Sequence, residues 1–394
     1  MNKKQFVITV AITAMIAILA TTIFYVTPIG KDIYSYVTYR ISGSPASKLL
    51  RIEALMDRYF MGDYSKIYMT KQAAMSFVSG ACEKYTSYLP EDVYKQMQES
   101  LDGHYVGIGV GIMLKNNEFV IESVTTGSPA HKAGLVKGDI IVSVNGKEYL
   151  PSQLQTLSAD IRNTPSGKST NIGIKRDGVV SVFEVVVDDL NLEYVTEKML
   201  DENIGYIRIE TFGNKVAESF EESLEKLQKQ GMKSLIIDVR SNPGGSLDTV
   251  VDICDTLLPE GVITTVKDKN GKEDVYKSDA DCIDLPMCVL INSESASASE
   301  ILAASLKEYK KATLVGEKTY GKGVVQGVFD LRDGSGLRIT IAKYFTPSGV
   351  CIDKTGVEPD VEVLLPEGTT FQSLEDESLA DPQMEKAIEI LKIS

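Results

Sequence analysis

An uncharged stretch opens the pattern of hydrophobic and polar positions: residues 5–30 carry no charge and are mostly apolar from 6 to 26. The stretch is long enough to cross a bilayer as a helix. Lys3 and Lys4 precede it, and positive residues favour the cytoplasmic side of a membrane. We therefore predict that residues 1–30 form a cytoplasmic tip and a single transmembrane signal-anchor. A cleaved signal peptide is the alternative, although the run is longer than a typical signal-peptide core and no clear small-x-small site closes it.

Three further regions differ in their periodicity. Residues 47–100 predict an N-terminal helical region, because apolar residues recur there at helical spacing. Residues 104–189 change to short alternating strands separated by glycine turns, which indicates a separate module. From 190 to 394, strands and helices alternate, which predicts an α/β core. The predicted strands of this core include 204–210, 235–240, 287–291 and 337–344, and its predicted helices include 217–230, 248–258 and 384–391.

Composition narrows the classes of function. The 394 residues, 43% of them hydrophobic, are enough for a sizeable core and for two or three domains. The chain has 41 basic and 55 acidic residues and no basic cluster outside the extreme N-terminus, so nucleic-acid binding is not expected. The five cysteines show no metal-ligand spacing, so no metal site is expected. Cys282 and Cys288 could form a disulfide outside the cytoplasm, which the sequence leaves open.

Candidate chemistry begins at the serine cluster that follows the predicted strand 287–291. Apolar residues recur with helical spacing behind it, so the serines lie where a buried strand turns into a helix. A helix start offers free N–H groups and favours negative charge, as a developing oxyanion requires. The other interpretation is structural, because Ser297 and Glu300 form a Ser-x-x-Glu capping box.

A lysine is the expected base for such a serine. The chain contains two histidines, His104 and His131, and both lie far upstream in the separate module. A Ser-His-Asp triad would need one of them to reach across to the serine cluster. Lys322 lies between two glycines after the cluster, and it could accept a hydroxyl proton if burial lowered its pKa.

These residues carry a resemblance to a known family. The pattern Ser-Ala-Ser-Ala-Ser-Glu at 295–300, followed by Gly-Lys-Gly at 321–323 and then Gln326, resembles the carboxyl-terminal processing peptidases, which are tail-specific serine proteases. The resemblance implies that Ser297 is the nucleophile, Lys322 the general base and Gln326 the residue that orients the lysine. The segment 321–329 is typical of a strand, and residues four apart on an extended strand are roughly 13 Å apart. Contact between Lys322 and Gln326 would therefore need a bend near Gly323 or long side chains that lean together.

The same family is marked by Asp-x-Arg-x-Asn-Pro-Gly-Gly, which stands here at 238–245. By composition alone this segment predicts a simple Asn-Pro-Gly turn. The resemblance implies that the N–H of Gly244 or Gly245 completes an oxyanion hole with the N–H of Ala298. It also implies a crotonase-like core without a metal or organic cofactor. The N-terminal helical region of this family often takes part in dimerisation, so a homodimer is a further expectation.

The module at 104–189 resembles a PDZ domain, through Gly-Ile-Gly-Val-Gly-Ile at 107–112 and the stretch 128–146. In such domains a glycine-rich loop lets backbone N–H groups converge on the terminal carboxylate of a peptide, which adds as a strand to the sheet edge. By this resemblance the carboxylate loop comprises Val106, Gly107, Ile108, Gly109 and Val110.

Together these patterns predict a bacterial, membrane-anchored serine endopeptidase on the extracytoplasmic side of the cell membrane. Its expected partners are the lipid bilayer and protein or peptide substrates with free C-terminal tails, which the PDZ module would bind or gate. The alternative function is a catalytically silent, membrane-anchored PDZ scaffold. The intact set of Ser297, Lys322 and Gln326 argues against that alternative.

Overall fold

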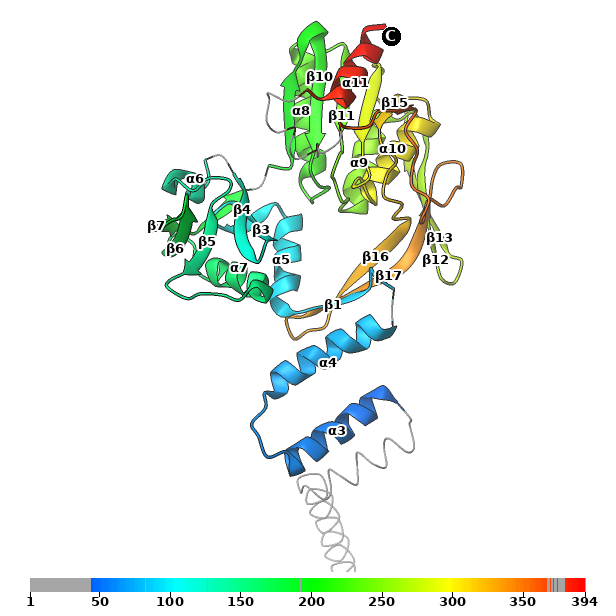
Figure 1. The fold of residues 1–394 in the computed structure, drawn as a ribbon. Coiled ribbons are helices and arrows are strands. Elements are labelled where there is room, and N and C mark those ends of the chain that lie inside the picture. The colour runs from blue at the N-terminus through cyan, green and yellow to red at the C-terminus, as the bar shows by residue number, and fades with distance from the viewer. Residues whose placement is uncertain are drawn as a thin grey trace, which may run out of the picture. The chain divides into compact units, whose positions relative to one another are not determined.

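The computed structural model describes residues 44–81, 83–125, 127–191, 193–366, 369, 371, 374 and 380–393. The membrane span predicted within residues 1–30 lies outside these residues, and no helix within them is long and apolar enough to cross a bilayer. The described residues divide into two units, one that ends at Ala73 and one that begins at Ala74. Figure 1 shows their helices and strands.

The described part of the first unit is helical. Helix α3 (Pro45–Tyr59) begins after Ser44, whose side chain caps the helix start. Helix α4 (Lys66–Ala81) starts in the first unit and ends in the second. At its start, Lys66 Nζ donates a hydrogen bond to Asp57 of α3 at 2.7 Å. The helical region predicted at 47–100 thus begins with two helices, and a short strand (Ser87–Leu89) and a third helix (Glu91–Leu101) follow within it.

The predicted PDZ module has a sheet and a hydrophobic core of its own. Five antiparallel strands follow the order β3-β4-β5-β6-β7, and β2 pairs separately with β8. Ile108, Ile121, Leu135 and Ile172 belong to a buried cluster that contains residues of this module alone. Its elements are β2 (His104–Gly107), β3 (Val110–Lys115), β4 (Glu118–Val124), α6 (Pro129–Ala133), β5 (Ile140–Val144), η1 (Pro151–Gln153), α7 (Leu154–Arg162), β6 (Ser169–Arg176), β7 (Val179–Val186) and β8 (Asp188–Asn191).

The remaining core is built on a six-stranded sheet in the order β18-β15-β14-β11-β10-β9. All neighbouring strands are parallel except β9, which runs antiparallel to β10. The predicted alternation of strands and helices is thus confirmed. The strands are β9 (Val195–Met199), β10 (Ile204–Ile209), β11 (Ser234–Asp238), β14 (Met287–Ile291), β15 (Ala312–Gly316) and β18 (Val361–Glu362), and a short helix η2 (Asp201–Asn203) links β9 to β10.

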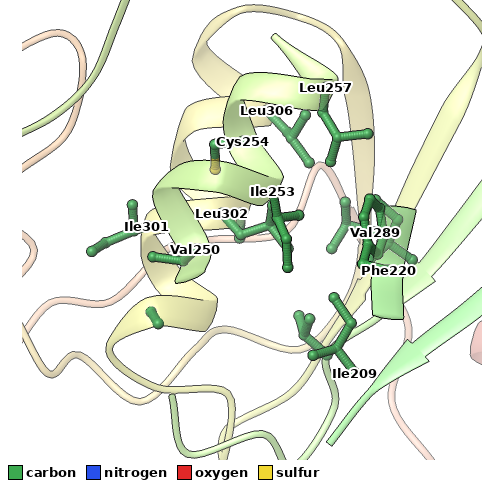
Figure 2. Close-up of a cluster of buried hydrophobic side chains, with 14 of the residues drawn as sticks. Ile209, Phe220, Val250, Ile253, Cys254, Leu257, Val289, Ile301, Leu302 and Leu306 are labelled. Carbon is green, nitrogen blue, oxygen red and sulfur yellow. The ribbon is translucent and has the colours of Figure 1, made fainter. Parts of the chain in front are cut away.

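Helices bury both faces of this sheet, as its apolar parallel strands require. Helices α8 (Val216–Lys229), α9 (Leu247–Leu257) and α10 (Ala298–Glu308) cover one face. Figure 2 shows this packing, with Ile253 of α9 and Leu302 of α10 between the helices and the sheet residue Val289. Helix α11 (Pro382–Ile393) covers the other face through Ala387 and Leu391.

A second sheet lies beside the core. Its order is β1-β17-β12-β13, and β16 pairs with β17 on the opposite edge from β1. Helix α5 (Glu91–Leu101) follows β1 directly. The strands are β1 (Ser87–Leu89), β12 (Gly261–Asp268), β13 (Glu273–Ser278), β16 (Val324–Asp330) and β17 (Gly336–Phe345).

The cysteines of the described residues are free thiols. Cys282 and Cys288, which the sequence allowed to pair, are not bridged. Cys288 is buried in β14, where burial raises the pKa of its thiol to about 12. It therefore acts as a small apolar core residue.

Candidate active site

Ser297 occupies a strained turn between β14 and α10. Its φ and ψ angles are 58° and −114°, an uncommon conformation for a residue with a side chain. Two neighbouring serines hold the turn from behind, because Ser295 Oγ donates to Val239 O at 2.7 Å and Ser299 Oγ donates to Asn242 O at 2.9 Å. Both are fully buried, so Ser297 is the serine of this cluster that the turn sets apart.

Gly244 packs directly against this turn. Its φ is +102°, and a Cβ added there would lie 2.7 Å from the Ser297 Cβ and 3.1 Å from the Ala298 nitrogen. The N–H of Gly244 donates to Asn242 Oδ1 at 2.9 Å. By contrast, the N–H groups of Gly245 and Ala298 make no hydrogen bond to another described residue. Two backbone donors are thus uncommitted, one directly after Ser297 and one directly after Gly244.

The side chains of Lys322 and Gln326 contact each other, and only Gln326 lies in a strand. The Lys322 Nζ donates to Gln326 Oε1 at 2.9 Å. Lys322 lies in the loop before β16, and the strand is irregular between Val325 and Gln326, so the two side chains are not four positions apart on one regular strand. Gln326 Nε2 donates to the backbone oxygen of Tyr85, which orients its Oε1 toward the lysine.

The surroundings of Lys322 favour its neutral form. Burial lowers the pKa of this lysine, and the positive charge of Arg338 lowers it further. The ring of Tyr85 lies 5.4 Å from Lys322 Nζ. A lowered pKa is the direction of change that lets a lysine act as a general base toward a hydroxyl.

Glu300 links the Ser297 turn to the Lys322 loop, a role that the sequence did not reveal. Its side chain is fully buried. Its Oε2 accepts hydrogen bonds from the N–H of Ser297 and the N–H of Lys322, both at 2.9 Å. Its Oε1 accepts from Thr319 Oγ1 at 2.6 Å and from the N–H of Gly321 at 2.8 Å. One carboxylate therefore fixes both loops.

Tyr344 of β17 adds a second link between the two loops. Its hydroxyl lies 2.5 Å from the backbone oxygen of Lys322 and 3.2 Å from the backbone oxygen of Ser297.

The side chains of Ser297 and Lys322 are not in direct contact, because no hydrogen bond connects Ser297 Oγ with Lys322 Nζ. Proton transfer between them requires a change in the lysine side chain, which here donates to Gln326 instead.

In the PDZ module a cavity of about 130 Å³ lies between β3 and α7. Of the predicted carboxylate-loop residues, Ile108 and Val110 line it, and Gly109 makes the turn between them with a φ of +78°. Val106 and Gly107 lie instead in β2, paired with Asp189 and Asp188 of β8. The other lining residues are Ile112, Ser158, Ile161 and Arg162.

The two histidines take no part in this site. His131 Nδ1 accepts from the N–H of Gly127 within the PDZ module, and His104 lies in β2. Among residues 44–393, as far as the structure describes them, no group of three or more histidine, cysteine, aspartate or glutamate residues could hold a metal ion.

Known proteins share this architecture. Residues 203–363 match the family model of peptidase family S41, and residues 106–187 match that of the PDZ domain. The carboxy-terminal processing protease CtpA of Bacillus subtilis (strain 168) is 34% identical over 298 residues, which cover 75% of this chain and 64% of that protein. A protein of Staphylococcus aureus (strain COL) named "Probable CtpA-like serine protease" is 32% identical over 372 residues, which cover 91% of this chain and 73% of that protein.

A solved structure agrees with these relatives. The photosystem II D1 C-terminal processing protease superposes with a TM-score of 0.52 at 27% sequence identity, covering 88% of this chain and 95% of that one. The family model, the relatives and the solved structure all point to the same family, as the serine and glycine motifs did. The chain is therefore a member of peptidase family S41 that carries a PDZ domain.

Proposed function

We propose that this chain is a serine endopeptidase that cleaves proteins at or near their C-terminal tails by a Ser297–Lys322 mechanism. One observation carries the proposal: a lysine with a lowered pKa is bonded to Gln326 and fixed, through the Glu300 carboxylate, to the turn that carries Ser297. Membership of a family of processing proteases supports the reaction class.

In this mechanism Ser297 Oγ attacks the scissile carbonyl carbon while its proton passes to the neutral Nζ of Lys322. The lysine side chain must first leave Gln326 and approach the hydroxyl. When the tetrahedral intermediate collapses, Lys322 returns the proton to the leaving amine and an acyl-enzyme remains. A water molecule then gives its proton to Lys322 and attacks the ester, which releases the new carboxyl end and restores Ser297.

The oxyanion of each tetrahedral intermediate would accept hydrogen bonds from Ala298 and Gly245. Ala298 follows Ser297, and Gly245 follows the glycine that packs against this turn. Both N–H groups are uncommitted among the described residues, whereas the N–H of Gly244 already donates to Asn242. This favours Gly245 over Gly244 as the second donor. Gly244 then serves by letting the backbone approach Ser297.

The placement of the enzyme is part of the proposal. The apolar residues 5–30 would anchor it in a bacterial cell membrane, with the peptidase on the extracytoplasmic side. The PDZ cavity beside Ile108 and Val110 would bind or gate the substrate tail. Parallel strands with helices on both faces are compatible with a crotonase-like core, and the helical region 47–100 is the expected site of homodimerisation.

The test is cleavage of an unstructured protein with an apolar C-terminus by the full chain in detergent, followed by mass spectrometry. Ser297→Ala and Lys322→Ala should each lower kcat by about 10⁴- to 10⁶-fold. Ser293→Ala is the matched control, because this nearby serine is exposed, and it should retain activity. If all three variants and the parent are equally inert, even with tail peptides added, the silent PDZ scaffold replaces this proposal.

A further inference from the structure

Arg338 of β17 projects from the same face of the sheet as Gln326 of β16, the residue that contacts Lys322. In the pairing of β16 with β17, Gln326 lies opposite Thr340 and Val328 lies opposite Arg338. Side chains two positions apart on a strand share a face, so Arg338 and Gln326 project to the same side. They form a diagonal cross-strand pair, which places their Cβ atoms roughly 7–8 Å apart, within reach of long side chains.

The Arg338 guanidinium forms no ion pair with any residue that the structure describes. Its Nε is buried without a hydrogen bond. The contrast with Arg240 is clear, since that guanidinium binds both Asp238 and Asp381. A partly buried cation without a counter-ion costs free energy unless an anion or water satisfies it.

A second unsatisfied group faces the same position. Ser87 of β1 lies directly opposite Arg338 on the other edge of β17, and its Oγ is also buried without a partner. Residues directly opposite each other on neighbouring strands have adjacent side chains. A guanidinium and a hydroxyl side by side are the donors that a carboxylate accepts from.

The site is connected to Lys322 through Gln326, because the diagonal neighbour of Arg338 accepts a hydrogen bond from Lys322 Nζ at 2.9 Å. The Arg338 charge also lowers the pKa of Lys322. An anion bound at Arg338 would consequently lie on the Lys322 side of the sheet. An extended peptide rises about 3.3 Å per residue, so the anion would belong to a residue a few positions from the bond that is cut.

We propose that Arg338 and Ser87 bind a carboxylate of the substrate, either the free C-terminal carboxylate of a short tail or an Asp or Glu side chain, within a few residues of the scissile bond. This specificity rests on the proposed peptidase function. It adds a carboxylate requirement in the peptidase core itself, separate from the PDZ cavity that Ile108 and Val110 line.

The test uses pairs of unstructured peptides and the full chain in detergent. In the first set, the two peptides of each pair differ only by Glu or Gln at one position, and the pairs cover the positions from four before to four after the mapped cut. All peptides of this set have an amidated C-terminus. The second set compares a free C-terminal carboxylate with an amide close after the cut. For at least one pair the parent should show a kcat/KM about tenfold to a hundredfold higher for the carboxylate form, as expected for one charge-assisted contact.

Variants assign the preference to its residues. Arg338→Gln should bring the ratio to about one, and Ser87→Ala should reduce it by a smaller factor. Arg332→Gln is the matched control, since Arg332 is exposed in the turn between β16 and β17, and it should keep the parent ratio. Each ratio compares two substrates of one enzyme at one pH, so changes in the protonation of Lys322 cancel.

The outcomes separate this inference from the proposed function. Parent ratios near one at every position, or a ratio that survives Arg338→Gln, would overturn the carboxylate site while leaving the peptidase intact. If Arg338→Gln does not fold, the parent ratio and the Ser87→Ala ratio still decide the question. Cleavage that persists in Ser297→Ala would instead overturn the proposed function.

Discussion

Lys322 can act as a base only while its amine is neutral, so its charged neighbours matter directly. Arg338 lowers the pKa of Lys322 in addition to burial. In Arg338→Gln the pKa of Lys322 should rise, because a like charge that disfavours the protonated amine is gone. At a given pH less of the lysine is then neutral. The acidic limb of the kcat/KM profile should therefore move to higher pH.

The measurement is the pH dependence of kcat/KM for one neutral, amidated peptide, which removes any effect of substrate carboxylates. The exposed Arg332→Gln variant should keep the parent profile. An unchanged acidic limb in Arg338→Gln would show that the Arg338 charge does not act on the base.

The sequence predicts the contacts of a residue when its partners are close in the chain and does not predict them when the partners are distant. The Ser-x-x-Glu pattern at 297–300 predicts a helix start, and Glu300 does accept from the N–H of Ser297. The same carboxylate also binds the N–H of Lys322, more than 20 positions downstream, which no local pattern contains. The contacts of Tyr85 and Tyr344 with Gln326 and Lys322 were missed for the same reason. The catalytic roles of Ser297, Lys322 and Gln326 themselves stay predictions.

At the scale of elements, the segment that links β11 to α9 approaches the Ser297 turn closely enough to require glycine. Gly244→Ala would place a methyl group 2.7 Å from the Ser297 Cβ and 2.8 Å from the Ala296 oxygen, so the turn must move. Because the two proposed oxyanion donors, Ala298 and Gly245, lie on these segments, kcat should fall by at least about 10²-fold. Steady-state kinetics with one peptide measures the loss.

Gly271→Ala is the control for backbone strain. Gly271 has a φ of +84° in the turn between β12 and β13, and an added Cβ meets nothing within 4 Å. This variant should lose roughly 1–2 kcal/mol of stability from the left-handed conformation alone and should keep its kcat. If Gly244→Ala and Gly271→Ala are equally active, glycine is needed at 244 only for its left-handed backbone conformation, and its close approach to Ser297 does not affect catalysis.

Periodicity predicted these elements well where they are long. The helix predicted at 217–230 is α8 (Val216–Lys229), and the one predicted at 384–391 is α11 (Pro382–Ile393). The distance problem between Lys322 and Gln326 arose because a strand was expected over 321–329, which contains both residues. In the structure β16 begins at Val324, and the irregularity before Gln326 brings its side chain to the lysine. Strand ends and bulges depend on the partner strand, which a single segment does not specify.

At the scale of the whole molecule, one buried ion pair connects the catalytic core to the end of the chain. Arg240, which is 3% exposed, follows β11 and precedes the glycines beside Ser297. Its Nη2 donates to Asp238 at 2.6 Å, and its Nη1 donates to Asp381 and Gln383 at 3.0 Å each. The start of α11 is thereby fixed to the loop that carries Gly244 and packs against Ser297.

Arg240→Met should consequently destabilise the molecule more than the loss of any single surface pair. The apolar side chain leaves Asp238 buried without its cation, which typically costs about 3–5 kcal/mol. Asp381→Asn removes only the partly exposed partner and keeps the Asp238–Arg240 pair, so it should cost about 1 kcal/mol or less. Urea unfolding followed by far-ultraviolet circular dichroism measures both. If both variants unfold at the same urea concentration as the parent, the contacts of Arg240 do not stabilise the molecule, and the apolar contacts of Ala387 and Leu391 hold α11 to the core.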